Sequence, residues 1–275
     1  MTFAVAIAAM ILLPDQPINT IWLTEDERIL ADLRIKRDTV GLAPSKGAKA
    51  GFMQAIKDPR LYLLCFMQNM HLSACSFNNF FPTVVGSLGF DHTITLVLTC
   101  PPYLVSGFVG YLVGFTSGKY NERTWHITIS MSAALVGFII SCITLNTAAR
   151  YIACFLFASG AYAVNSVILG YVPSNFHSLY STYIIHSWVS ATLGQTTEKK
   201  AVSLSLVNVI ANASYIYTAY LYPKSDGPKY LTAMGANSGF AFATIASAWV
   251  FRFWLQRANL KMKRSGGEGQ VFYAY

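Results

Sequence analysis

Long stretches of this chain carry no charged residue, and each is long enough for a membrane-spanning helix. Asp, Glu, Lys and Arg are absent from 61–90, 124–149, 151–197, 201–223 and 230–251. A bilayer core about 30 Å thick requires roughly 20 apolar residues in a helix, and backbone groups in lipid must be satisfied within the segment. The pattern therefore predicts an all-α integral membrane protein whose six spans cover Leu61–Val85, Ile94–Thr116, His126–Leu145, Tyr151–Leu169, Ala201–Tyr222 and Leu231–Trp254.

The part of the chain before these spans follows a different pattern. Residues 1–14 are apolar up to Pro14, but at 1.5 Å per residue they cover only roughly 20 Å of the bilayer core. They lack the basic start and small-residue cleavage site of a signal peptide, which is the alternative. We therefore expect the end of a helix whose beginning is missing, which would make the chain a fragment.

Residues 15–60 are expected to form a loop with two short helices. Thr24 and Glu27 make a capping-box pattern that predicts the start of an exposed helix. The stretch "VGLAPSKGAKAG" has the composition of a linker. "FMQAIKDPR" indicates a short amphipathic helix at the membrane interface.

The composition and the distribution of charge support a membrane protein with a defined orientation. Hydrophobic residues make up 54% and charged residues 12% of the chain, whereas an ordinary soluble domain carries about 25% charged residues. If 15–60 and the tail 255–275 are cytoplasmic, seventeen of the twenty Lys and Arg residues lie inside, and only Arg150, Lys224 and Lys229 lie outside. The net charge of +8 then reflects topology and attraction to anionic lipid, and no nucleic-acid partner is expected.

No pattern of catalytic or metal-binding residues occurs in the sequence. The five cysteines lie in predicted spans without CxxC spacing, and the five histidines form no HExxH or HxxxH pair. G-x-S-x-G and P-loop motifs are also absent. The sequence therefore argues against an enzyme, a metal site and a cofactor.

Uncharged polar side chains inside the spans are the candidates for substrate binding. His71, Asn78 and Asn79 lie in the first span, and Asn208 and Asn212 share one helical face of the fifth because they are four residues apart. Such side chains favour contact with water or substrate, and His71 is an ionisable group deep in a span. Hydrogen bonds between helices are the structural alternative for each of them.

Several segments together resemble the fungal allantoate permease-like anion:cation symporters, a branch of the major facilitator superfamily. They are "LPDQPINTIWLTEDERILADLRIKRD", "FFPTVVGSLGF", "LTCPPYL", "NERTWHI", "WVSATLGQTTEKKAVSLSLVN" and "YPKSDGPKYLTAMGANSG", in the order of the family. The resemblance implies a transporter of twelve helices, of which this chain supplies the end of helix 6, the central loop and helices 7 to 12. It also implies a small organic anion such as allantoate, nicotinate or another vitamin as substrate, a proton as coupling ion, an N-terminal half as partner and a location in the plasma membrane.

The same resemblance implies a gating loop between helices 8 and 9, with Ser117, Lys119 and Arg123 as candidate residues. Similar proteins have an Asp-Arg pair where this sequence has Gly118-Lys119, which weakens the expectation of a normal charge network there. A six-helix membrane protein that does not transport, and serves as an interaction or assembly partner, is the second hypothesis for this chain.

The segment 171–187, "YVPSNFHSLYSTYIIHS", has no counterpart in the family pattern. It adds no charge to a loop predicted to be cytoplasmic, and unstructured loops longer than about 12 to 15 residues are uncommon. Its ends permit splice signals in the genetic code, so we interpret it as a translated intron. An authentic aromatic segment at the interface is the alternative.

Overall fold

The computed structural model describes residues 20, 23–37, 47–120, 122–165, 167–168, 181–182, 189, 192–193, 196–264 and 273. The predicted end of helix 6 at 1–14 lies outside the described residues. So does the predicted insertion at 171–187, apart from Ser181–Thr182, which form strand β2. This strand pairs antiparallel with β1 (Val167–Ile168).

Two short helices precede the spans, as the sequence predicts. In α2 (Glu25–Arg37) the Glu27 carboxylate accepts hydrogen bonds from the Thr24 backbone N–H at 3.0 Å and from its hydroxyl at 2.8 Å, which confirms Thr24 as the start signal. Helix α3 (Ala48–Ile56) follows, and its buried residues Gly51 and Ala55 face the bundle.

The first predicted span is not one continuous helix. It divides into α4 (Pro59–Ala74), the 3₁₀ segment η2 (Cys75–Phe80) and α5 (Phe81–Gly86). Two physical causes act at this point: "CSFNNF" contains residues that favour turns over helix interiors, and Pro82 occupies the first turn of α5, where a helix tolerates proline. The prediction of an uninterrupted helix over Leu61–Val85 was therefore wrong.

The other predicted spans correspond to helices whose ends differ by a few residues. They are α6 (His92–Tyr120), α7 (Thr124–Ile143), α8 (Thr147–Asn165), α10 (Thr197–Asn212) with α11 (Ser214–Thr218) and η3 (Ala219–Leu221), and α12 (Leu231–Arg264). The short segment η4 (Lys224–Asp226) lies before α12. The fourth span ends earlier than predicted, at Asn165 instead of Leu169, whereas α12 continues ten residues past Trp254. Five helical stretches of the described chain are long and apolar enough to cross a membrane.

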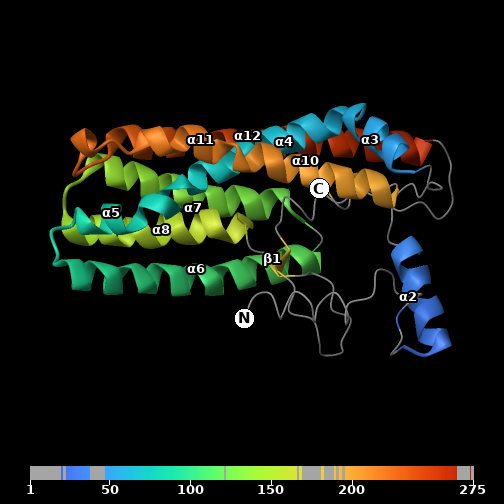
Figure 1. Ribbon diagram of the computed structural model, residues 1–275, viewed down its shortest axis with the longest axis horizontal. Coiled ribbons are helices and arrows are strands. Elements are labelled where there is room, and N and C mark those ends of the chain that lie inside the picture. Colours follow the sequence, from blue (N-terminus) through green and yellow to red (C-terminus); the bar gives the residue numbers. More distant parts are fainter. Residues whose placement is uncertain are drawn as a thin grey trace.

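The long helices lie side by side along one axis (Figure 1). Helix α7 packs against α8 and α12, α8 also packs against α6, and α4 packs against α10 and α12. Gly160 of α8 brings α7 and α8 into close contact, because a Cβ atom there would lie 2.3 Å from the Ser130 carbonyl oxygen. A core of fully buried aromatic rings, Phe77, Phe81, Phe138 and Phe157, fills the space beside η2.

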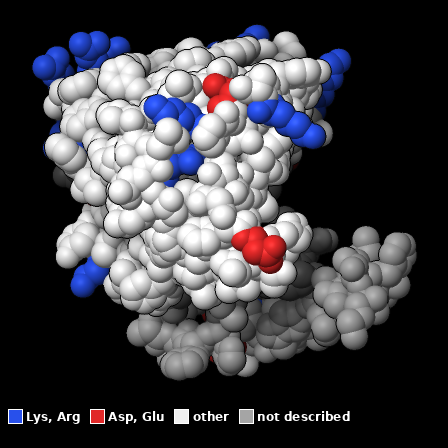
Figure 2. Space-filling view, turned by 90° about the vertical axis from the view of Figure 1, so that its left-hand side faces the viewer, with Lys and Arg blue, Asp and Glu red and all other residues white. Residues whose placement is uncertain are grey.

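The two ends of the bundle differ in charge. One end, here the basic end, holds the starts of α4 and α10, the turn from α6 to α7 and the last turns of α12. Figure 2 shows the opposite end, which is mostly uncharged. Arg150, Lys224 and Lys229 belong to helix ends and connections there, where the predicted topology has them.

Candidate substrate site and gating network

The break in the first span exposes two asparagines beside a tyrosine. Asn78 and Asn79 of η2 are both exposed. The Tyr103 hydroxyl of α6 donates a hydrogen bond to Asn78 Oδ1 at 2.8 Å. The Tyr103 ring lies 5.0 Å from Phe81 and 5.8 Å from Tyr162. The site therefore offers amide and hydroxyl groups next to aromatic rings.

A second polar contact lies nearer the start of the same span. Asn69 Nδ2 donates to the Ile210 carbonyl at 2.7 Å, and Asn69 Oδ1 accepts from the Tyr217 hydroxyl at 2.8 Å. Ser73 Oγ lies 2.5 Å from the same hydroxyl. These bonds join α4 to α10 and α11. Asn69 therefore makes hydrogen bonds between helices, which is the alternative to substrate binding that the sequence left open for polar residues in spans.

His71 lies in the interior of the bundle. Its side chain is 0% exposed. Its Nε2 atom is 3.1 Å from the Ala161 carbonyl oxygen of α8 and 3.6 Å from Cys75 Sγ. Direct contact between His71 and a substrate therefore requires a rearrangement of α4 against α8.

Asn208 and Asn212 lie together, as their spacing predicts. Asn212 Nδ2 donates to Asn208 Oδ1 at 2.6 Å and to the Asn208 carbonyl at 2.8 Å, and both side chains are exposed. Within the described part of the chain, no hydrogen bond connects this pair to Asn78 or Asn79. The five predicted substrate-binding residues thus fall into three separate places: the exposed η2 asparagines, the α10 pair and the buried histidine.

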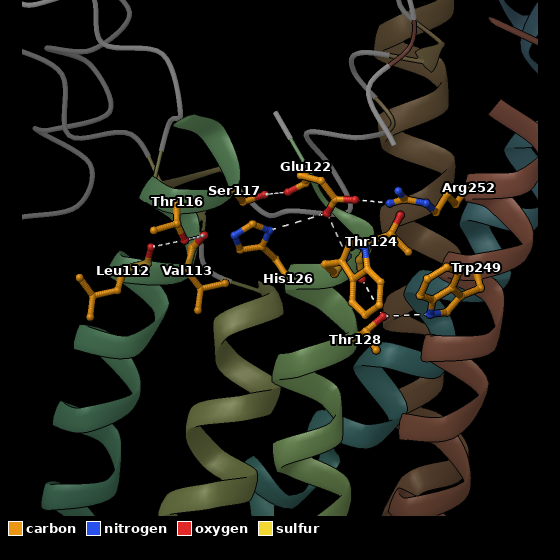
Figure 3. A network of polar contacts seen from close by, with 11 residues as sticks. Leu112, Val113, Thr116, Ser117, Glu122, Thr124, His126, Thr128, Trp249 and Arg252 are labelled. Atoms are coloured by element: carbon orange, nitrogen blue, oxygen red, sulfur yellow. Dashed lines mark hydrogen bonds and ion pairs between the residues drawn. The ribbon is translucent and has the colours of Figure 1, made fainter. Parts of the chain in front are cut away.

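The predicted gating residues lie where α6 meets α7. Figure 3 shows one of them, Ser117, beside Glu122. Helix α6 continues to Tyr120, so Ser117 and Lys119 belong to its last turn and not to a loop as predicted. The Ser117 hydroxyl donates to the Glu122 carbonyl at 2.8 Å and fixes the turn. Lys119 is exposed and lies over the Tyr120 ring, with Nζ 5.9 Å from the ring centroid.

Glu122 is the centre of a charge network that joins this turn to α12. Its Oε1 atom pairs with Arg252, and its Oε2 atom accepts the Trp125 backbone N–H at 3.0 Å. His126 Nδ1 faces the same carboxylate at 3.9 Å. The Trp125 and Trp249 rings meet edge to face, 5.0 Å apart. A charge network is therefore present at this turn, although the sequence has Gly118-Lys119 in place of the Asp-Arg pair that the resemblance implies.

Arg123 is the most desolvated cation of this region. Its Nη1 atom is buried and has no hydrogen-bond partner among the residues that the structure describes. Burial lowers the pKa of Arg123 to about 10 because a low-dielectric environment disfavours the charged form.

A second charge network joins the starts of α4 and α10. Asp58 is the N-cap of α4 and accepts from the Arg60 backbone N–H at 3.1 Å. Its carboxylate also accepts from Arg60 Nε at 2.8 Å, from Arg60 Nη2 at 2.6 Å and from Lys199 Nζ at 2.8 Å. Burial by itself raises the pKa of Asp58, but the bonds from Arg60 and Lys199 outweigh it and hold the pKa at about 2.

Sequence reasoning missed Tyr103, Glu122 and Asp58 as site or network residues. Asp58 carried a recognisable signal, since Asp before Pro59 is a preferred start of a helix. No sequence signal pointed to Tyr103 or Glu122, because their partners Asn78 and Arg252 are 25 and 130 residues away in the chain.

Comparisons with known proteins agree with this architecture. The family model of the Major Facilitator Superfamily matches residues 1–197. The chain is 27% identical to an uncharacterized transporter of Schizosaccharomyces pombe over 93% of this chain and 48% of that protein. It is 25% identical to the major facilitator-type transporter hxnP of Emericella nidulans, over 97% of this chain and 51% of hxnP. It is 24% identical to the thiamine pathway transporter of Saccharomyces cerevisiae, over 84% of this chain and 42% of that protein.

The chain therefore spans about half the length of the curated relatives it matches. No solved structure matches it.

Proposed function

Because the chain belongs to the Major Facilitator Superfamily, we propose that it forms the C-terminal half of a carrier that moves a small organic anion across the plasma membrane by proton symport. Its relatives are named transporters, not enzymes, which supports transport as the activity. Allantoate, nicotinate and other vitamin or carboxylate compounds are the proposed substrates.

The observation that carries this proposal is the set of uncharged donors at the break in the first span. The side-chain amides of Asn78 and Asn79 can donate hydrogen bonds to a carboxylate, and the Tyr103 hydroxyl orients Asn78 because it donates to Asn78 Oδ1. Discontinuous helices form the substrate sites of many secondary carriers. Asn208 and Asn212 are proposed to extend this polar lining when the two halves of the carrier meet.

The charge of the substrate and of the proton must also be accommodated. An anion in a low-dielectric site requires a cationic partner, and the described spans hold Lys and Arg only near their ends. We assign that partner to the N-terminal half. His71 is the proton-handling candidate on this chain, since it is an intramembrane His that contacts the α8 backbone.

The test is an uptake screen of the completed gene in a fungus without its own permeases, with labelled allantoate and nicotinate. Saturable uptake that a protonophore abolishes is expected. His71→Ala should lower the uptake and flatten its dependence on pH, while Cys65→Ala, at another buried position of the same helix, should do neither. An unchanged pH profile for His71→Ala would leave this residue with a structural role only.

Reconstituted alone in liposomes, the 275-residue chain is expected to show no saturable uptake, because the substrate site of such carriers lies between two halves. Uptake above that of empty liposomes would contradict this. If the completed gene transports none of these compounds, the alternative of an assembly partner gains support.

A further inference from the structure

Tyr273, the one described residue after Arg264, lies against the bundle at the basic end. Tyr273 lies two residues before the last residue, Tyr275. Its backbone N–H donates to Asn259 Oδ1 at 3.0 Å, and its carbonyl accepts from Asn259 Nδ2 at 2.9 Å. Asn259 of α12 is only 7% exposed, so one nearly buried amide is fully used in holding the backbone of the tail.

The Tyr273 side chain contacts a different helix, α4. The Arg60 guanidinium at the start of α4 lies over its ring, 5.4 Å from the centroid, which is the geometry of a cation–π contact. Tyr273 also packs against the hydrophobic cluster that includes Leu61 and Leu255. Tyr273 thus bridges the end of α12 and the start of α4.

Arg60 has a fixed orientation because Asp58 accepts two bonds from its guanidinium. The same carboxylate accepts the ammonium of Lys199 at the start of α10. Tail, α4, α10 and α12 are therefore connected through consecutive contacts at one end of the bundle.

We propose that Tyr273 is an intramolecular strap: docked on Asn259 and Arg60, it braces the basic end of the bundle against separation of α4 from α12. Release of the strap loosens the start of α4.

Hydrogen exchange of the full chain in lipid nanodiscs tests the strap. Asn259→Leu keeps the approximate size of the side chain and removes both bonds to Tyr273. Amide exchange in the tail should become about tenfold faster, and exchange at the first amides of α4 should also rise. Tyr273→Phe keeps the ring and the backbone bonds but removes the hydroxyl that interacts with Arg60, so exchange should rise less than in Asn259→Leu.

Tyr273→Ser removes the ring and leaves Asn259 in place, so it keeps the test valid if Asn259→Leu does not fold. Exchange of the Tyr273 amide should again increase. Equal tail exchange in the parent chain and in both variants at 259 and 273 would overturn the proposal. Faster tail exchange with no change at the start of α4 would overturn the bracing role.

Discussion

Neutralising Asp58 should destabilise the bundle more than any other single charge removal at its surface. Asp58→Asn keeps the shape of the side chain and its ability to cap α4. It leaves the Arg60 guanidinium and the Lys199 ammonium without their shared counter-charge. This loss matters because the Lys199 side chain is only 8% exposed and has little contact with water. Removing one partner of a buried ion pair costs about 3 to 5 kcal/mol. Since Arg60 is 19% exposed and partly screened, we expect a loss of about 3 kcal/mol in the free energy of unfolding.

The lowered pKa of the Asp58 carboxyl gives a second estimate of this loss in the free energy of unfolding. The bonds from Arg60 and Lys199 lower the pKa of Asp58 from 3.8 to about 2, and one pKa unit corresponds to about 1.4 kcal/mol. Because the folded-state pKa is depressed, the stabilisation is present above about pH 4 and is lost as the pH falls toward about 2. The linked free energy is at most about 2 to 3 kcal/mol, which agrees with the estimate from the ion pair.

Unfolding of the purified chain in mixed micelles, followed by circular dichroism as the denaturing detergent increases, measures this difference. Lys57→Met is the matched control, because it removes an adjacent exposed charge and should change stability by less than about 0.5 kcal/mol. The part of the loss of stability between pH 4 and 2 that is due to Asp58, at most about 2 to 3 kcal/mol, should be absent in Asp58→Asn. If Asp58→Asn unfolds like the control, the Asp58 network has no role in stability and the reasoning is refuted.

Two further predictions concern packing and the α6–α7 turn. Gly160→Ala would place a methyl group 2.3 Å from the Ser130 carbonyl oxygen, so α7 and α8 must separate and about 2 kcal/mol or more of stability should be lost. Gly107→Ala, where nothing lies within 4 Å, should be neutral in the same unfolding assay, and equal effects at both positions would contradict the close contact. Glu122→Gln should weaken the interaction of this side chain with Arg252 by about 1 to 2 kcal/mol and increase proteolysis at the α6–α7 turn. An unchanged cleavage rate would show that the ion pair does not stabilise this turn.

The candidate gating and substrate-binding residues show which contacts the spacing of residues within one helix can predict. The spacing of Asn208 and Asn212 already places them on one helix face, and the structure confirms their contact. The burial of His71 against Ala161 and the pairing of Glu122 with Arg252 are contacts between helices. Periodicity within one helix contains no information about which neighbour a given face will meet, so these roles could not be assigned from the sequence.

The charge-free stretches by themselves determined that the chain spans a membrane as helices, because lipid offers no other partner for the backbone. Their approximate bounds follow from the same constraint: α6 and α7 lie within a few residues of the predicted spans, and α12 begins at the predicted Leu231. The local sequence permits a break in the first span, but the tertiary structure fixes it at Cys75–Phe80, since η2 is held by Tyr103 through Asn78 and by the aromatic core around Phe77. The tertiary structure alone decided that Asp58 and Glu122 are centres of charge networks, because a carboxylate acquires that role only when folding brings distant cations within bonding distance and removes water from around them.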